Sequence, residues 1–200
     1  MLTRIAVLVS GGGTNLQALI DAERAGRIPS GQIVLVVSTS PKAYALERAK
    51  AAGIPAQYLP REGFEPALEQ ALAEHGVELV ILAGFLRILS AEFTARRPRR
   101  ILNVHPSLIP AFCGQGMYGL RVHEAALARG VKVSGATVHF VNEIPDGGEI
   151  LLQKAVEVLD GDTPETLQRR VMEQAEWKLL PQAAELVCRE IINLSSEDAK

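Results

Sequence analysis

The chain has 200 residues, with 21 basic and 23 acidic side chains and a formal net charge of −2. This length suits one domain, and the near-neutral balance gives no bulk electrostatic reason to expect nucleic-acid binding. No stretch approaches the roughly 20 apolar residues of a membrane span, and residues 1–10 lead into a glycine loop instead of resembling a signal peptide. The two distant cysteines form no metal-ligand pattern. We therefore predict a cytoplasmic protein without nucleic-acid, membrane or metal partners.

Apolar, β-branched segments alternate with helical patterns over the first hundred residues. The expected strands cover residues 5–10, 33–38, 56–60, 78–84 and 101–104, and the expected helices cover 15–26, 43–53, 64–76 and 90–97. Strands that are apolar on both faces and separated by helices imply a parallel sheet covered on both sides. The sequence thus predicts a doubly wound, mostly parallel, Rossmann-like α/β sheet. We expect a single domain over residues 1–194 and a disordered tail over 195–200.

The pattern changes after the fifth expected strand. Residues 106–119 form a loop with three glycines and two prolines, and loops of this length inside domains are often functional. A short helix and two strands joined by an Asp-Gly-Gly turn should follow as an antiparallel extension of the sheet. Thr163 and Pro164 are expected to begin a final helix, which Pro181 should break or kink.

Residues 10–16, Ser-Gly-Gly-Gly-Thr-Asn-Leu, join the first strand to the first helix. Backbone N–H groups at a helix N-terminus bind anions. A dinucleotide fingerprint would need a third glycine where Leu16 stands and an acidic residue after the second strand, and a P-loop would need a lysine. We therefore favour a single phosphate on the N–H groups of Gly13, Thr14 and Asn15. The alternative is a tight turn that needs glycine for its dihedral angles.

Asn103 and His105 follow the fifth strand, on one face of an extended segment that Pro106 stiffens. Ligands of open α/β sheets bind at the carboxyl ends of the strands. An amide and a protonated imidazole can both donate to a developing oxyanion, and Asp146 could favour the imidazolium. Because no serine or cysteine is placed as an obvious nucleophile, direct acyl transfer or hydrolysis is predicted. The alternative is a structural histidine and a plain turn at Asp146. His139 is interpreted as a strand residue that is structural or supports the site.

Five segments together resemble the phosphoribosylglycinamide formyltransferases of purine biosynthesis. They are residues 10–20, 82–90, 103–112, 135–141 and 146–148, and the resemblance runs in order from about residue 4 to 181. The Asn-x-His-Pro-Ser-Leu-Ile-Pro motif with a later Asp-Gly-Gly is specific to folate-dependent formyltransferases. The glycine-rich opening narrows the resemblance to the glycinamide ribonucleotide branch.

This resemblance implies transfer of a formyl group from the cosubstrate 10-formyltetrahydrofolate to the amine of glycinamide ribonucleotide. It implies that Asn103 and His105 stabilise the tetrahedral oxyanion, with His105 as general acid. Asp146 would pair with His105, keep it protonated and assist proton movement through water.

The resemblance also implies the two substrate sites. Gly13, Thr14 and Asn15 would hold the phosphate of the ribonucleotide, while Glu176 and the preceding Glu173 match a helix that contacts its ribose and glycinamide. The match at Glu176 requires a one-residue shift. The residues that would border the folate are Leu86, Arg87, Ile88, Leu89, Asn142, Glu143, Ile144 and Pro145, with Arg61 as the nearest candidate for binding its glutamate tail.

Other functions remain open from the residues alone. A formyltetrahydrofolate hydrolase, or a formyltransferase that acts on a different amine, shares the same core but usually carries an additional module. From other classes come a nicotinamide-dependent oxidoreductase, which the glycine loop disfavours, and a sensor that binds a phosphorylated metabolite. The expected partners are small molecules, and the chain is expected to be a monomer or a homodimer.

Overall fold

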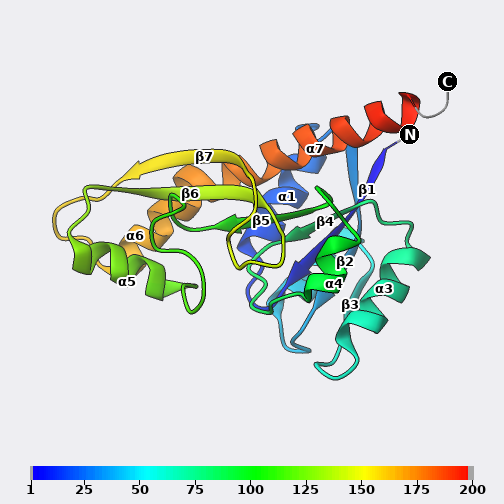
Figure 1. Ribbon diagram of the computed structural model, residues 1–200, viewed down its shortest axis with the longest axis horizontal. Coiled ribbons are helices and arrows are strands. Elements are labelled where there is room, and N and C mark those ends of the chain that lie inside the picture. The colour runs from blue at the N-terminus through cyan, green and yellow to red at the C-terminus, as the bar shows by residue number, and fades with distance from the viewer. Residues whose placement is uncertain (1, 198–200) are drawn as a thin grey trace.

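In the computed structural model, which describes residues 2–197, one seven-stranded sheet carries helices on both faces (Figure 1). The strands are β1 (Thr3–Val9), β2 (Gly31–Ser38), β3 (Ala56–Tyr58), β4 (Leu79–Leu82), β5 (Ile101–His105), β6 (Val133–Phe140) and β7 (Ile150–Glu157). The α-helices are α1 (Thr14–Arg24), α2 (Tyr44–Ala52), α3 (Phe64–Glu74), α4 (Ala91–Ala95), α5 (Leu120–Arg129), α6 (Pro164–Val171) and α7 (Trp177–Glu197). A π-helix, η1 (Met172–Glu176), joins α6 to α7.

The strand order is β3-β2-β1-β4-β5-β6-β7. The first five strands are parallel, whereas β6 runs antiparallel to β5 and β7 antiparallel to β6. The predicted mostly parallel sheet with an antiparallel extension is therefore confirmed. In Figure 1 this extension lies at one end of the molecule, with α5 and α6 beside it.

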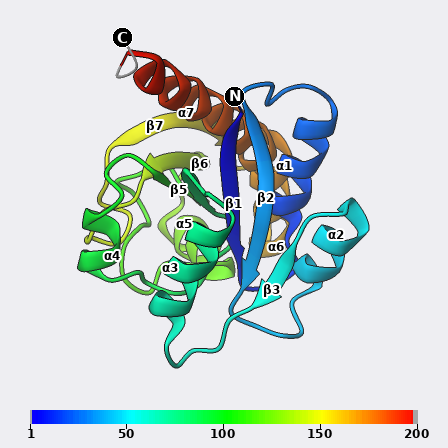
Figure 2. The same ribbon diagram turned by 90° about the vertical axis from the view of Figure 1, so that its right-hand side faces the viewer.

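The core has two layers, one on each face of the sheet. Alternate residues of β1 face opposite layers, because successive side chains of a strand point to opposite faces. Ile5 and Val7 pack with residues of α1, α2 and α7, whereas Ala6 and Leu8 pack with residues of α3 and α4. Figure 2 shows α3 and α4 on one side of the parallel strands and α1 and α2 on the other.

The last helices form one helical run from Pro164 to Glu197. The hydroxyl of Thr163 accepts from the N–H of Thr166 at 3.3 Å, and Pro164 takes the first turn, as predicted. The sequence predicts that Pro181 breaks or kinks the helix; α7 continues through Pro181 to Glu197, so the break is wrong. We attribute this to η1, which lies directly before α7: a π-turn changes the hydrogen-bond register at that point, so the helix accommodates the proline ring.

The expected tail is partly helical. α7 extends to Glu197, and the hydroxyls of Ser195 and Ser196 donate to the carbonyls of Ile191 and Ile192, four residues earlier, at 3.0 and 2.8 Å. The last three residues, 198–200, lie outside the described part of the chain. No helix within residues 2–197 combines the length and apolar character that crossing a membrane requires.

Candidate active site

Three strand ends meet at one edge of the sheet. β1, β4 and β5 are neighbours and run parallel, so their carboxyl ends lie side by side. β1 leads into the glycine loop, β4 leads into residues 83–90, and β5 ends at His105. The three sets of residues that the sequence singled out are therefore brought to one place by the topology of the sheet.

Ser10 ties the glycine loop to the segment after β4. Its N–H donates to the carbonyl of Gly84 at 3.1 Å, and its hydroxyl accepts from the N–H of Leu86 at 3.0 Å. The same hydroxyl lies 2.9 Å from the hydroxyl of Thr39, at the end of β2. One small polar side chain thus connects three loops at the edge of the sheet.

The glycine loop presents free N–H groups. Among residues 2–197, no backbone or side-chain acceptor bonds the N–H groups of residues 11–15. Gly13 begins α1 with a positive φ of 73°, and a Cβ there would lie 2.6 Å from the Cβ of Ala45. The tight-turn interpretation is therefore correct for Gly13, and it is compatible with an anion site because free N–H groups at a helix N-terminus attract negative charge.

Glu176 lies beside this loop. The Nδ2 of Asn15 donates to the Oε2 of Glu176 at 2.6 Å, and both side chains are buried. Burial raises the pKa of Glu176 to about 7, and the hydrogen bond from Asn15 opposes that rise. Glu176 belongs to η1. Glu173 instead pairs with Arg169 at 2.8 Å and is exposed, so the structure does not bring it to Asn15.

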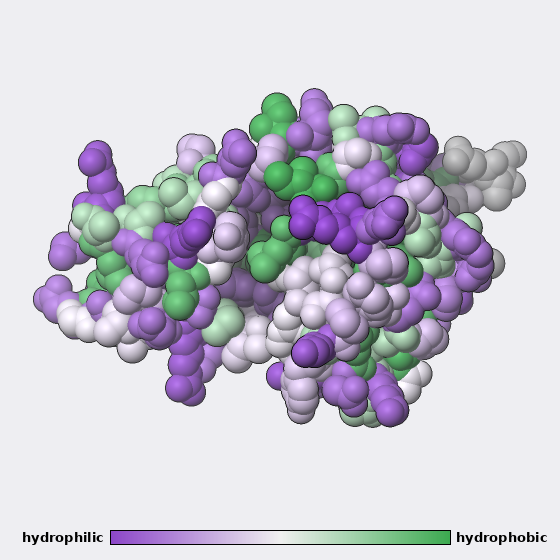
Figure 3. All heavy atoms as spheres, turned by 90° about the horizontal axis from the view of Figure 1, so that it is seen from below, coloured by the Kyte–Doolittle hydropathy of each residue, from purple (hydrophilic) through white to green (hydrophobic). Residues whose placement is uncertain are grey.

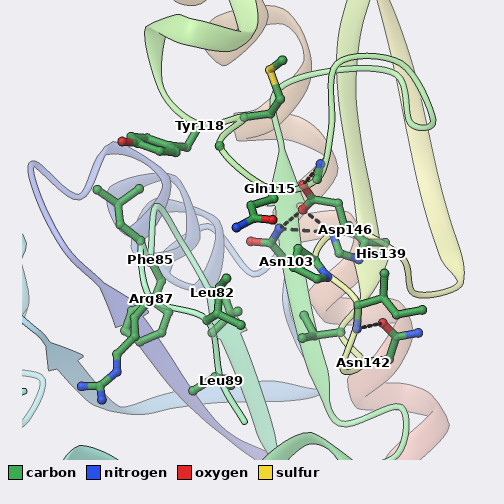
Figure 4. A pocket seen from close by; sticks show the side chains of 18 residues that line it. Leu82, Phe85, Arg87, Leu89, Asn103, Gln115, Tyr118, His139, Asn142 and Asp146 are labelled. Carbon is green, nitrogen blue, oxygen red and sulfur yellow. Dashed lines mark hydrogen bonds and ion pairs between the residues drawn. The ribbon is translucent and has the colours of Figure 1, made fainter. Parts of the chain in front are cut away.

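Four polar side chains, Asn103, His105, His139 and Asp146, form a cluster at the end of β5, and Figure 4 shows Asn103, His139 and Asp146. The Nδ2 of Asn103 lies 3.1 Å from the Nε2 of His139 and 3.4 Å from the Oδ1 of Asp146. Asp146 also lies within ion-pair distance of two imidazoles, with 3.4 Å between its Oδ2 and the Nδ1 of His105 and 3.5 Å between its Oδ1 and the Nε2 of His139. The register of β5 against β6 places His139 opposite Asn103.

Asp146 is held as a carboxylate. Burial opposes its ionisation, but the hydrogen bonds from His139 and the Gly114 N–H and the charges of the histidines outweigh burial, so its pKa is lowered. The Gly114 N–H donates to Oδ2 at 2.8 Å. The Asp-Gly-Gly turn is sterically fixed, since a Cβ on Gly148 would lie 1.7 Å from the carbonyl oxygen of Phe140. Asp146 is therefore both a turn residue, with φ 56°, and a member of the cluster.

His105 lies behind Asp146 and is buried. Its Nδ1 faces Asp146, and its Nε2 lies 2.8 Å from the carbonyl oxygen of Phe112. Both ring nitrogens are thus occupied by the protein itself, and His105 does not line the cavity described next. The loop after β5 provides these contacts through its backbone, at Phe112 for His105 and at Gly114 for Asp146.

A cavity of about 240 Å³ opens beside the cluster, with Asn103, His139 and Asp146 in its wall. Its rim carries large apolar side chains that are more than half exposed, namely Leu86, Ile88 and Ile144. From below, the molecule is hollowed near its middle, and hydrophobic side chains lie beside the hollow (Figure 3). The cavity combines an apolar slot with a small number of polar groups, which is typical of sites for small organic molecules.

Most of the residues predicted to border a folate line this cavity. Those that do are Leu86, Arg87, Ile88, Leu89, Asn142, Ile144 and Pro145. Glu143 and Arg61 do not. Arg61 is exposed, and its carbonyl accepts from the Nη1 of Arg87 at 3.0 Å, while the guanidinium of Arg87 lies 4.6 Å from the ring centre of Phe64.

The sequence interpretation missed part of the cavity wall. The wall also includes Leu82, Phe85, Gly114, Gln115, Gly116, Met117, Tyr118, His139 and Val141. For the residues of the 106–119 loop, the loop's length and three glycines were the only sequence features that pointed to a functional role. The sequence predicts a structural or supporting role for His139, and its contacts with Asn103 and Asp146 favour a supporting role at the site.

A family model described as formyl transferase matches residues 3–184. The chain is similar to phosphoribosylglycinamide formyltransferase of Haemophilus influenzae, with 42% identity over 186 residues that cover 90% of this chain and 84% of the relative. A chloroplastic protein of the same name from Arabidopsis thaliana is 41% identical over 196 residues, covering 94% and 66%. The human trifunctional purine biosynthetic protein adenosine-3 is 45% identical over 197 residues, covering 96% and 19%. The chain thus spans less than two thirds of the length of some curated relatives.

Solved structures show the same fold. Glycinamide ribonucleotide transformylase 1 from Symbiobacterium toebii superposes with a TM-score of 0.87 at 45% identity, covering 94% of this chain and 89% of that one. A formyltetrahydrofolate deformylase from Pseudomonas putida gives a TM-score of 0.80 at 29% identity, covering 92% and 65%. The fold is therefore common to proteins named for transfer and for hydrolysis of a formyl group.

Proposed function

Because the chain belongs to the formyl transferase family, we propose that it transfers a formyl group from 10-formyltetrahydrofolate to the amine of glycinamide ribonucleotide, a step of de novo purine (IMP) biosynthesis. The observation that carries the proposal is the meeting of two unlike sites at one edge of the sheet. One is a loop of free N–H groups suited to a phosphate. The other is an apolar cavity whose wall holds Asn103 and Asp146.

The amine nitrogen attacks the formyl carbon, and the carbonyl oxygen becomes an oxyanion. The Asn103 amide donates to that oxyanion after turning from His139, which lies at 3.1 Å; one such donor typically lowers the barrier by about 3–4 kcal/mol. The N–C bond to the ribonucleotide forms and the bond from the formyl carbon to N10 of the folate breaks. The amine loses one proton and N10 gains one.

Asp146 and His105 handle these protons. Asp146 is ionised, because its pKa is lowered, and it lies in the wall of the cavity. It accepts the amine proton through water and orients His105 through the 3.4 Å contact at Nδ1. His105 acts as general acid once its Nε2 leaves the carbonyl of Phe112.

The ribonucleotide and the folate take opposite sides of the reacting atoms. The N–H groups of Gly13, Thr14 and Asn15 hold the phosphate, and the Glu176 carboxyl beside Asn15 reaches the ribose and glycinamide. The pterin lies in the apolar cavity, where its edge meets the backbone of residues 142–146. No resident metal is part of this scheme. We further propose that the protein acts in the cytoplasm, as a monomer or a homodimer.

A second candidate is hydrolysis of 10-formyltetrahydrofolate, favoured by the similarity to the Pseudomonas putida deformylase. In that reaction water replaces the amine, and the phosphate loop has no role. The third candidate, a sensor of a phosphorylated metabolite, uses the loop but performs no chemistry.

One assay separates these functions. The protein is mixed with 10-formyltetrahydrofolate with and without glycinamide ribonucleotide, and deformylation is followed by folate absorbance. We expect deformylation only with the amine; deformylation without it indicates the hydrolase, and none in either mixture rejects the proposal. In the same assay, Asn103→Ala should lower kcat by about 100-fold or more. An unchanged thermal midpoint would confirm that the variant remains folded.

A further inference from the structure

The backbone carbonyls of Gly11, Gly12 and Gly13 in the glycine loop all accept hydrogen bonds from other groups of the protein. The carbonyl of Gly11 accepts from the N–H of Ala45 at 3.2 Å, and that of Gly13 accepts from the N–H of Gln17 at 2.9 Å. The carbonyl of Gly12 accepts from the Nε of Arg48 at 2.8 Å. Two of these three donors, Ala45 and Arg48, belong to α2. The sequence alone did not predict that this helix contacts the glycine loop.

These contacts decide where the free N–H groups point. In a planar trans peptide, the C=O of one residue and the N–H of the next point in opposite directions. Fixing the carbonyl of Gly12 on Arg48 therefore aims the N–H of Gly13 away from α2. The N–H groups of residues 11–15 bond no acceptor among residues 2–197, so they remain free for an anion.

Arg48 is itself held in place. Its Nη1 donates to the Oε1 of Gln17 at 3.0 Å, and the Nε2 of Gln17 donates to Asp21 at 2.9 Å. Its guanidinium lies 5.0 Å from the ring centre of Tyr44, within the range of a cation–π contact. The planar guanidinium thus bonds two acceptors on two segments, the glycine loop and α1, which a lysine ammonium on its flexible stem cannot reproduce with the same fixed geometry.

Arg48 also brings positive charge to the loop. It borders a cavity of about 320 Å³ together with Thr14 and Arg27, and Thr14 is one of the residues proposed to bind the phosphate. An Arg48 side chain carbon lies 3.5 Å from where a Cβ of Gly13 would stand. A cation this close to a helix N-terminus strengthens the attraction for an anion.

We propose that Arg48 is a positioning residue for the phosphate of the ribonucleotide: it aims the N–H of Gly13 and adds its charge, and it sets affinity without touching the reacting atoms. This inference rests on the proposed function for the identity of the substrate. The claim that Arg48 holds the glycine loop in shape for anion binding can be tested by phosphate binding alone, without measuring turnover.

The test compares Arg48→Met, Arg48→Lys and a matched control, Arg24→Met. Met keeps the apolar stem and removes the donors and the charge, Lys keeps the charge alone, and Arg24 makes one 3.4 Å contact to the carbonyl of Ala52, away from the loop. For Arg48→Met we expect KM for glycinamide ribonucleotide to rise about tenfold or more, with kcat and KM for the folate within about twofold of wild type. Arg48→Lys should show a smaller rise, and Arg24→Met none.

Inorganic phosphate supplies the second measurement, by titration of each folded variant at low and high salt. Wild type and Arg24→Met should bind phosphate more tightly than Arg48→Met, and the difference should shrink at high salt. Equal phosphate affinity in wild type and both Arg48 variants, or a loss of kcat without a change in KM, overturns the inference. If the wild type binds phosphate through Arg48 yet catalyses no formyl transfer, the proposed reaction fails while this inference holds.

Discussion

The buried carboxyl of Glu176 leads to a prediction about stability and pH. Its pKa is raised from 4.5 to about 7 in the folded protein, because burial penalises the charged form. Glu176→Gln keeps the shape and an oxygen that accepts from Asn15, but it cannot ionise. Comparing the two proteins isolates this one titration, since all other groups are common to both.

Because the pKa of Glu176 is raised in the folded protein, the wild type loses stability as the pH rises. Well below pH 4.5, Glu176 is neutral in both the folded and the unfolded chain, and its burial costs no ionisation energy. As the pH rises from 4.5 through 7, the unfolded chain releases its proton first, so the wild type loses stability relative to the variant. A shift of 2.5 pKa units (7 − 4.5) at about 1.4 kcal/mol per unit gives a loss of about 3 kcal/mol.

The measurement is the free energy of unfolding in urea at pH 5, 6, 7 and 8 for both proteins. Part of this loss has already occurred at pH 5, so the difference between wild type and Glu176→Gln should change by roughly 2–3 kcal/mol from pH 5 to pH 8, in favour of the variant at high pH. Glu173→Gln is the control, because Glu173 is exposed and forms a surface ion pair with Arg169. A difference that stays flat with pH would mean that Glu176 titrates as an ordinary exposed carboxyl, and the argument from burial would be refuted.

Two further substitutions test the cluster and the fold. Asp146→Asn should lower kcat by about 100-fold or more while the variant still binds glycinamide ribonucleotide, and unchanged turnover would reject a proton-transfer role. Asp162 holds Arg170 through a part-buried ion pair and has a lowered pKa because of the hydrogen bond from Arg170. Asp162→Asn should therefore lower the free energy of unfolding at pH 7 by about 1–2 kcal/mol, measured in urea. Asp160→Asn, at an exposed site, should change it little.

Local patterns predicted most of the parallel sheet. The sequences of β1, β2 and β4 predict buried strands because both faces of each strand are apolar. Ser90 and Thr163 stand directly before predicted helices, where a hydroxyl side chain caps the helix N-terminus, and in the structure both do so. The strand-end rule also located Asn103 and the glycine loop correctly at the edge of the sheet. These features depend on neighbours in sequence or on a rule of topology, so one sequence is enough.

Contacts between distant segments could not be predicted in the same way. His139 reaches Asn103 only because β6 pairs antiparallel with β5 in one particular register, and a shift by one residue would turn His139 to the other face. Arg48 reaches the glycine loop only because α2 packs against it. The contact between His105 and the carbonyl of Phe112 depends on the path of a loop, and backbone acceptors leave no mark in the sequence.

Ser10 has a consequence for how the two substrates affect each other. Its hydroxyl accepts from the backbone of Leu86, while its own backbone begins the glycine loop. Any shift of the glycine loop when the proposed ribonucleotide binds is therefore passed to the segment proposed to border the folate. Thermodynamic linkage makes any such effect reciprocal: the factor by which bound ribonucleotide changes the affinity for folate equals the factor by which bound folate changes the affinity for ribonucleotide.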